Sequence, residues 1–338
     1  MLTRKQFITG ALGLAGAAAA GDAVRAQDTA IELKVSHYLP PNHTFQKELV
    51  AWGDALEKAS AGRLKLRVYP ASQLGPVNRQ FDMARNGTAD ITVVLHGATP
   101  GRFPITELVS LPYMSPSAGS TSAIASRRLT ELSGQYLVAE HPGVQILWMA
   151  VTNPLMFHSS KVAIRHPDDF KGLRVRYAGE GFAQIITALG ATPLAVPPGE
   201  TQDGLAKGII DAATFPYEAC QSFDLGTVVK YSLEPGISSA TFAVVMNQRK
   251  FDNLPTDLRA LISKSTGIEC AAEFGKAFDV AEKAGREYML GKGVQIITLS
   301  PNDLQAIKTK VEPMIAASLD NVEKTGKPGK AFLAAYRA

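Results

Sequence analysis

Hydrophobic and polar positions first alternate and then recur with helical spacing along the start of the chain. Ile31–His37 alternates between the two kinds, which is typical of a strand with one buried face. Apolar residues then recur every three or four positions over Phe45–Ala59, which predicts an amphipathic helix that ends at Gly62. A strand, a helix and a further strand are expected next, over Leu64–Val68, about Val77–Arg85 and Ala89–Leu95. The last of these strands is almost wholly apolar, so we place it in the middle of a sheet.

The segment Asp168–Ala219 repeats this order as strand, helix, strand, helix and strand. Such repeats predict a mostly parallel sheet with helices packed on it. Because no low-complexity linker separates the two α/β units, we expect elements that cross between them. The other expected elements are a helix over about Ser120–Ala139, strands over Gln145–Ala150 and Thr241–Met246, one long helix over Thr256–Leu290, a strand over Val294–Leu299 and helix from Pro301 to the end.

The first 26 residues have the pattern of an export signal. A basic start with Arg4 and Lys5 precedes the apolar run Ile8–Gly21, and small residues precede Gln27. This run is too short to span a membrane. We therefore expect residues 1–26 to be a signal peptide, cleaved near Ala26/Gln27, and the protein to be periplasmic. Lysine in the second place of a near twin-arginine pattern leaves the Sec and Tat routes both open.

Composition limits the partners of the mature chain. A chain of 338 residues, 46% of them hydrophobic, can build two domains with cores of their own. Removal of the signal takes away three positive charges and one negative, so the formal net charge falls from +4 to +2. A near-neutral chain argues against a nucleic-acid partner.

The exported location permits a disulfide between Cys220 and Cys270, but their apolar, small-residue surroundings favour two free thiols.

Catalytic and metal-binding motifs are absent from the sequence. It has no HExxH, CxxC, GxSxG or Walker pattern, and its six histidines lack the spacing of metal ligands. We therefore expect no metal, no cofactor and no enzymatic activity. An exported enzyme acting on small acids stays as an alternative, which turnover of candidate acids by the pure protein would reveal.

Arg176 is the candidate for anion binding. It lies where the first strand of the repeated segment meets a turn with Ala178, Gly179 and Gly181. Glycines let a ligand approach the backbone closely, so this combination suggests an anion site. Arg174 and Arg176 share one face of the strand, and strand alternation leaves open which of them faces a ligand.

Four stretches, found together and in this order, resemble the solute receptors of tripartite ATP-independent periplasmic (TRAP) transporters. They read LKVSHYLPPNHTFQKELVAWGDALEKASAGRLKLRVYPASQLG, NGTADITVV, FKGLRVR and LGATPLAVPPGETQDGLAKGIIDA. The resemblance extends from about Ile31 to Pro313. It implies a periplasmic-binding-protein-like α/β fold, with two domains around a cleft, crossing hinge strands and a long spanning helix. Domain I would comprise residues 27–152 and about 242–281, and domain II about 153–241 and 282–338.

The resemblance also implies a function. Such receptors capture a small organic acid and deliver it to the TRAP permease subunits in the membrane, and we expect a monomer here. The family arginine that grips the ligand carboxylate corresponds to Arg176, which follows Lys171-Gly172-Leu173. A planar guanidinium matches a carboxylate with two parallel hydrogen bonds. The alternative is a ligand-presenting subunit of a sensor, and a neighbouring gene for transport subunits or for a histidine kinase would separate the two.

Departures from the family pattern narrow the expected ligand. A polar run found in many receptors is replaced here by residues that include Phe215, and a second pocket position is the apolar Met156. The PGRFP loop, with Arg102, resembles the subgroup that takes aromatic or other monocarboxylates. We therefore expect one carboxylate on Arg176 and an aromatic or hydrophobic body against Phe215; the alternative is that Phe215 and Met156 are core residues.

Further candidates lie at strand ends, where α/β sheets bind ligands. These candidates are His37, Tyr38, Leu95 and His96, with Tyr217 completing an aromatic wall. Glu218 would be a cation ligand by analogy with a few family members, but no other residue nearby supplies a metal shell. The expected site thus has no metal.

Overall fold

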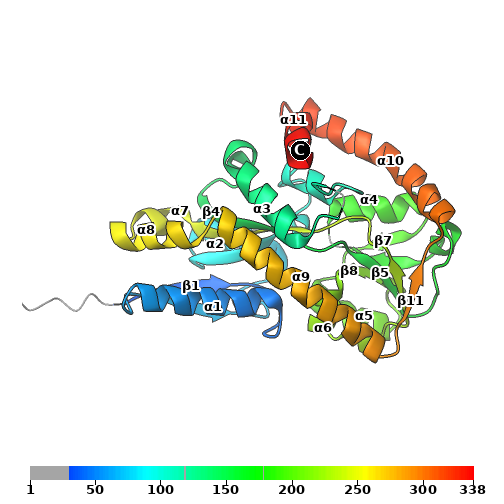
Figure 1. The fold of residues 1–338 in the computed structure, drawn as a ribbon, viewed down its shortest axis with the longest axis horizontal. Helices are drawn as coiled ribbons and strands as arrows, with labels where there is room; N and C mark the ends of the chain where they lie inside the picture. The colour runs from blue at the N-terminus through cyan, green and yellow to red at the C-terminus, as the bar shows by residue number, and fades with distance from the viewer. Residues whose placement is uncertain (1–29, 118, 178) are drawn as a thin grey trace, which may run out of the picture.

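The computed structural model describes residues 30–117, 119–177 and 179–338, and the chain folds into two sheets flanked by helices (Figure 1). The strand order is β2-β1-β3-β10-β4 in the first sheet and β11-β9-β5-β8-β6-β7 in the second. The expected two-domain α/β architecture is confirmed. The expected signal peptide and Ala178 lie outside the described residues.

The first sheet is largely as the hydrophobic pattern predicts. Its strands and helices are β1 (Ile31–Ser36), α1 (Thr44–Ala59), β2 (Leu64–Tyr69), α2 (Gln80–Asn86), β3 (Ile91–Leu95), α3 (Ser122–Leu132), β4 (Val144–Val151), β10 (Thr241–Asn247) and α7 (Gln248–Asp252). All five positions of β3 are buried, as expected for an apolar central strand. Strands β1, β2 and β3 pair in parallel, and β10 runs antiparallel between β3 and β4.

The second sheet contains two strands that the sequence pattern did not predict, β5 and β9. Its elements are β5 (Met156–Ser159), β6 (Arg174–Arg176), α4 (Glu180–Ala188), β7 (Thr192–Leu194), α5 (Thr201–Ala206), β8 (Ala212–Phe215), α6 (Tyr217–Ser222), β9 (Tyr231–Glu234) and β11 (Gln295–Thr298). The chain passes from β4 of the first sheet into β5 and returns from β9 into β10. Strand β5 runs antiparallel to β8 and β9, and β10 runs antiparallel to β3 and β4.

The expected single helix over Thr256–Leu290 is two helices, so that prediction was wrong in its continuity. Thr266 is extended and ends α8 (Thr256–Ser265), and Gly267, with a positive φ of +86° that favours glycine, precedes α9 (Ile268–Gly291). Helix α9 runs diagonally across the molecule and packs on α3 and α6 (Figure 1). It is the helix that spans both sheets.

Two carboxylates of α9 attach it to one helix of each sheet. Asp279 accepts hydrogen bonds from the backbone N–H groups of Ser122 (2.8 Å) and Ala123 (3.2 Å), where α3 begins. One turn later, Glu282 accepts from the N–H groups of Tyr217 and Glu218 (both 3.0 Å), where α6 begins. Helix N-termini carry unpaired N–H groups and a partial positive charge, so both contacts are favourable.

The C-terminal part of the chain returns to the first sheet. The helix expected from Pro301 to the end is divided into α10 (Pro301–Lys324) and α11 (Gly329–Arg337). Helix α10 packs on α4, whereas α11 packs on α3, with Phe332 and Tyr336 buried in the core of the first sheet. The last helix therefore packs against elements of the first sheet. No helix in the described part of the chain combines the length and apolarity that crossing a membrane requires.

Candidate functional site

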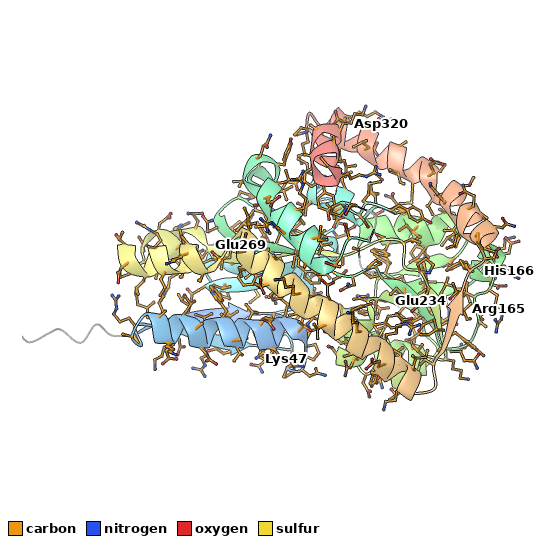
Figure 2. The ribbon with its side chains drawn as sticks, in the orientation of Figure 1. Lys47, Arg165, His166, Glu234, Glu269 and Asp320 are labelled. Carbon is orange, nitrogen blue, oxygen red and sulfur yellow. The ribbon has the colours of Figure 1, made fainter. Side chains whose placement is uncertain are left out.

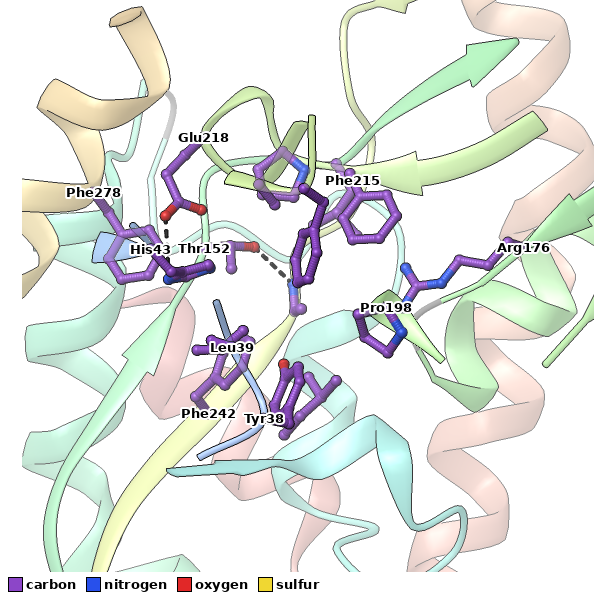
Figure 3. A pocket seen from close by; sticks show the side chains of 16 residues that line it. Tyr38, Leu39, His43, Thr152, Arg176, Pro198, Phe215, Glu218, Phe242 and Phe278 are labelled. Carbon is purple, nitrogen blue, oxygen red and sulfur yellow. Dashed lines mark hydrogen bonds and ion pairs between the residues drawn. The ribbon is translucent and has the colours of Figure 1, made fainter. Parts of the chain in front are cut away.

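A cavity lies between the two sheets, at the ends of their strands (Figure 3). Strands β6 and β8 are parallel, so their carboxyl ends bring Arg176 and Phe215 to one edge. Tyr38 and Leu95, which follow or end β1 and β3, face them from the other sheet. The cavity has a volume of about 40 Å³ and adjoins a wider groove of about 960 Å³, which Tyr38, Leu95 and Arg176 also line.

The lining is mainly apolar and aromatic, with few polar side chains. Its apolar side chains include Leu39, Leu95, Leu155, Phe215, Phe223, Phe242 and Phe278, and its polar ones are Tyr38, His43, Thr152, Arg176 and Glu218. An apolar cavity with a few convergent polar groups is the usual form of a small-molecule site.

Arg176 is the buried cation of this cavity. Its side chain is 2% exposed, Nε donates to the carbonyl of Val196 (3.1 Å), and Nη1 donates to the carbonyl of Thr214 (3.1 Å). Within the described residues, Nη2 has no hydrogen-bond partner and no acidic side chain pairs with the guanidinium. Burial lowers the pKa of Arg176 to about 10, so the group stays charged at neutral pH. The guanidinium thus has no acidic partner in direct contact among the described residues.

Two aromatic side chains shape the surroundings of the guanidinium. Its Cζ lies 4.2 Å from the centroid of the Phe215 ring, a cation–π contact that covers one face of the group. Nη2 is left to donate to a planar anion. Burial raises the pKa of Tyr38, so its hydroxyl keeps the proton; no described residue bonds this hydroxyl, which lies at the cavity (Figure 3). Tyr38 can donate to the same anion.

Glu218 is the acidic side chain of the cavity, and it is 2% exposed. Its Oε1 accepts from the backbone N–H of Thr44 (3.3 Å) and lies 3.3 Å from Nδ1 of His43. Its Oε2 is buried without a hydrogen-bond partner among the described residues. Burial raises the pKa of Glu218 to about 7 and lowers that of His43 to about 3, so the histidine is neutral.

The raised pKa of Glu218 predicts a pH-dependent stability that Glu218→Gln removes. The folded state retains the proton up to about pH 7, whereas the unfolded chain releases it near 4.5. Between these values the folded state binds more protons, so wild-type stability falls as pH rises, by at most about 1.4 kcal/mol per pH unit. Urea unfolding at pH 5 and pH 8 should show Glu218→Gln gaining stability relative to wild type at the higher pH.

The control for this measurement is Glu269→Gln, because Glu269 is an exposed glutamate on α9 (Figure 2). The difference in free energy of unfolding between Glu269→Gln and wild type should be the same at pH 5 and pH 8. An equal difference for Glu218→Gln at pH 5 and pH 8 would contradict the raised pKa.

Four of the eight side chains expected at the site line the cavity, and four do not. Those in the lining are Arg176, Phe215, Tyr38 and Leu95. The others are His37, His96, Met156 and Tyr217, which the structure places away from it.

The two histidines turn into the interior of the first domain. His37 contacts Gln46, with 2.7 Å between Nε2 and Oε1. His96 lies between Thr241 and His141, at 3.1 Å from each. Burial lowers the pKa of both histidines, so both rings are neutral. A neutral ring can be buried there without a counter-charge.

Tyr217 and Met156 lie behind the cavity wall. The Tyr217 hydroxyl donates to Glu234 (2.9 Å), the last residue of β9, which Figure 2 labels. Met156 pairs with Phe215 across β5 and β8, and its sulfur packs beside Gly236. Both act as packing residues here.

The structure also separates Arg174 from Arg176. Arg174 pairs with Asp211 through Nε and Nη2, both at 2.9 Å, at the outer end of β6. Arg102 pairs with Asp82 and stacks on Phe81, outside the cavity.

The glycines after Arg176 have a different use from the expected one. Gly179 has φ +131°, and a Cβ there would lie 2.9 Å from Cα of Gly97, which belongs to the first sheet's domain. At Gly181, a Cβ would lie 3.2 Å from the carbonyl oxygen of Ser110. These glycines allow close approach of the other domain's backbone, rather than of a ligand alone.

Sequence reasoning missed His43, Thr152 and three of the cavity's phenylalanines, Phe223, Phe242 and Phe278. It assigned Glu218 only to a cation. The sequence does contain a signal for His43, because it precedes α1 and its Nδ1 accepts from the N–H of Phe45 (3.1 Å), as an N-cap does.

Within the described residues no group of three or more potential ligands could hold a metal ion. Cys220 and Cys270 are free thiols, as their surroundings predicted.

Comparisons with known proteins agree with this architecture. The family model of bacterial extracellular solute-binding proteins, family 7, matches residues 35–321. A TRAP solute-binding protein from Rhodoferax ferrireducens, solved with copurified benzoate, superimposes with a TM-score of 0.86 at 28% identity, over 91% of this chain and 97% of that one. One from Bordetella bronchiseptica, solved with bound (R)- and (S)-mandelate, gives 0.84 at 30% identity, over 91% and 98%.

A similar relative among characterised proteins is the C4-dicarboxylate-binding periplasmic protein DctP of Rhodobacter capsulatus. It is 25% identical over 287 residues, which is 84% of either chain. The family model covers well over half of the sequence, and the members of this family bind solutes and are not enzymes. The chain therefore belongs to the family 7 extracellular solute-binding proteins, the solute receptors of TRAP transporters.

Proposed function

We propose that this receptor binds a small organic monocarboxylate with an aromatic or hydrophobic body in the periplasm and delivers it to TRAP permease subunits. The observation that carries the proposal is the guanidinium of Arg176, buried beside a cavity without an acidic partner among the described residues. An unpaired buried charge is costly. A ligand carboxylate would supply the missing charge and accept from Nη2.

The lining supports the rest of the ligand description. Arg176 is the one lysine or arginine among the described residues of the inner cavity, so a second ligand carboxylate would find no cationic partner there. Phe215, Phe223 and Phe242 offer apolar surface to a ring. The structurally similar proteins solved with benzoate and with mandelate support an aromatic acid.

We further infer that binding closes a hinge. The cavity is lined from both sheets, so a ligand would contact both halves and favour the closed state. The moving halves would be residues 27–152 with about 242–281, and about 153–241 with 282–338. We expect a monomer, exported by the segment 1–26.

A thermal-shift panel tests the ligand class. Benzoate, mandelate and phenylacetate should raise the melting temperature by several degrees at saturating concentration, because a ligand that binds only the folded state stabilises it. Succinate and aliphatic sugar acids should not. Stabilisation by succinate with none by the aromatic acids would overturn the proposed ligand class, and isothermal titration calorimetry of the hits would supply affinities.

A further inference from the structure

The cavity has a second polar end, whose bonding is incomplete. Glu218 lies across the cavity from Arg176, with Phe215 between them (Figure 3). Its side chain is only 2% exposed, and its Oε2 is buried without a hydrogen-bond partner among the described residues. Buried carboxyl oxygens are nearly always hydrogen-bonded, so this atom points to a group that a ligand would supply.

The neighbours of Glu218 determine what kind of group fits. Nδ1 of His43 accepts from the N–H of Phe45 (3.1 Å), so the proton of this neutral ring is on Nε2. Nδ1 also lies 3.3 Å from Oε1 of Glu218, but its single lone pair already accepts from Phe45. When Glu218 is ionised, Oε2 has no proton to donate and can only accept a hydrogen bond.

We propose that Glu218, oriented by His43 and Thr44, forms a subsite for a hydrogen-bond donor of the ligand, a hydroxyl group on the end away from the carboxylate. The proposal rests on the proposed function, since it takes the ligand carboxylate to lie on Arg176. It makes the preferred substrate a hydroxylated aromatic monocarboxylate. A ring between the two polar ends would pack against Phe215, Phe223 and Phe242.

The experiment compares ligands that differ only in the donor. Calorimetry would measure the affinity of wild type for 3- and 4-hydroxybenzoate and for 3- and 4-fluorobenzoate, because fluorine is small and cannot donate. At least one hydroxylated isomer should bind about tenfold or more tightly than its fluorinated counterpart, as expected for a hydrogen bond to a carboxyl group. In Glu218→Leu this ratio should fall to about one.

Glu218→Gln serves as the second variant, since an amide keeps an acceptor oxygen and should retain an intermediate ratio. Glu48→Gln is the matched control: Glu48 lies on α1 in a separate surface pocket beside Trp52, and its variant should keep the wild-type ratio. A hydroxyl preference below threefold in wild type, or one that persists in Glu218→Leu, would overturn the subsite.

The outcome separates the subsite from the proposed function. Binding of fluorobenzoates with no hydroxyl preference would leave the Arg176 site standing and remove the Glu218 subsite. Absence of binding for all four acids would overturn the aromatic ligand class, and the subsite with it.

Discussion

Arg176→Gln is expected to lower the affinity for the carboxylate ligand by about 30-fold to several thousand-fold. Loss of one partner of a buried, hydrogen-bonded ion pair typically costs about 2–5 kcal/mol, which corresponds to that range. Glutamine retains donors of similar reach but has neither the charge nor the planar fork. Isothermal titration calorimetry with the best acid from the thermal-shift panel measures the change.

The same substitution should not unfold the protein. In the ligand-free chain it removes a buried charge that no described acidic residue neutralises, so the melting temperature should stay the same or rise. Arg174→Gln is the matched control, since Arg174 lies two residues away on β6 and pairs with Asp211 (2.9 Å) at the outer end of the strand. It should retain ligand affinity. Unchanged affinity in Arg176→Gln would remove the basis of the proposed function.

Gly285→Ala is expected to lower the free energy of unfolding by about 3 kcal/mol, at the upper end of the usual cost of overpacking. A Cβ at this position would lie 2.2 Å from the carbonyl oxygen of Tyr217 and 2.7 Å from the backbone nitrogen of Glu218. Backbone atoms at the start of α6 cannot rotate away as a side chain can. Helix α9 would have to move, which would also weaken the contacts of Glu282 with the same two residues.

Urea unfolding of both proteins measures this loss, and Gly291→Ala serves as its control. Gly291 belongs to the same helix, but a Cβ there meets nothing within 4 Å. Alanine at that position should be neutral or stabilising by up to about 1 kcal/mol, because it restricts the unfolded chain and favours helix. Equal stabilities of the two variants would contradict the tight packing of α9 on α6.

Strand and helix order was largely predictable because the buried faces of these elements repeat with the periods of strands and helices. The apolar run at β3 and the alternation in β1 illustrate this. The boundary at Gly267 was not predictable, since glycine is tolerated within helices, as at Gly275 and Gly285. Only the backbone shows it: Thr266 is extended and Gly267 has a φ of +86°. Strands β5 and β9 were not predicted, although they are as long as β8 and β11, which were.

The residues of the candidate site were predictable where the family pattern names a specific position. Arg176 and Phe215 were named from the family pattern, and both line the cavity. His37 and His96 follow the same rule of strand ends but bond to Gln46, Thr241 and His141 instead. A residue's position near a strand end sets where its backbone lies, whereas the side chain turns toward whichever partners the fold supplies.

By itself, the sequence determined the α/β class, the family and the arginine at the end of β6, because these depend on local periodicity and on residue order. Only the tertiary structure decided which side chains share the cavity. His43 precedes α1 and Glu218 belongs to α6, 175 positions further along the chain, and their 3.3 Å contact exists because the two sheets face each other. Contacts between distant segments depend on the packing of whole elements, which no local pattern encodes.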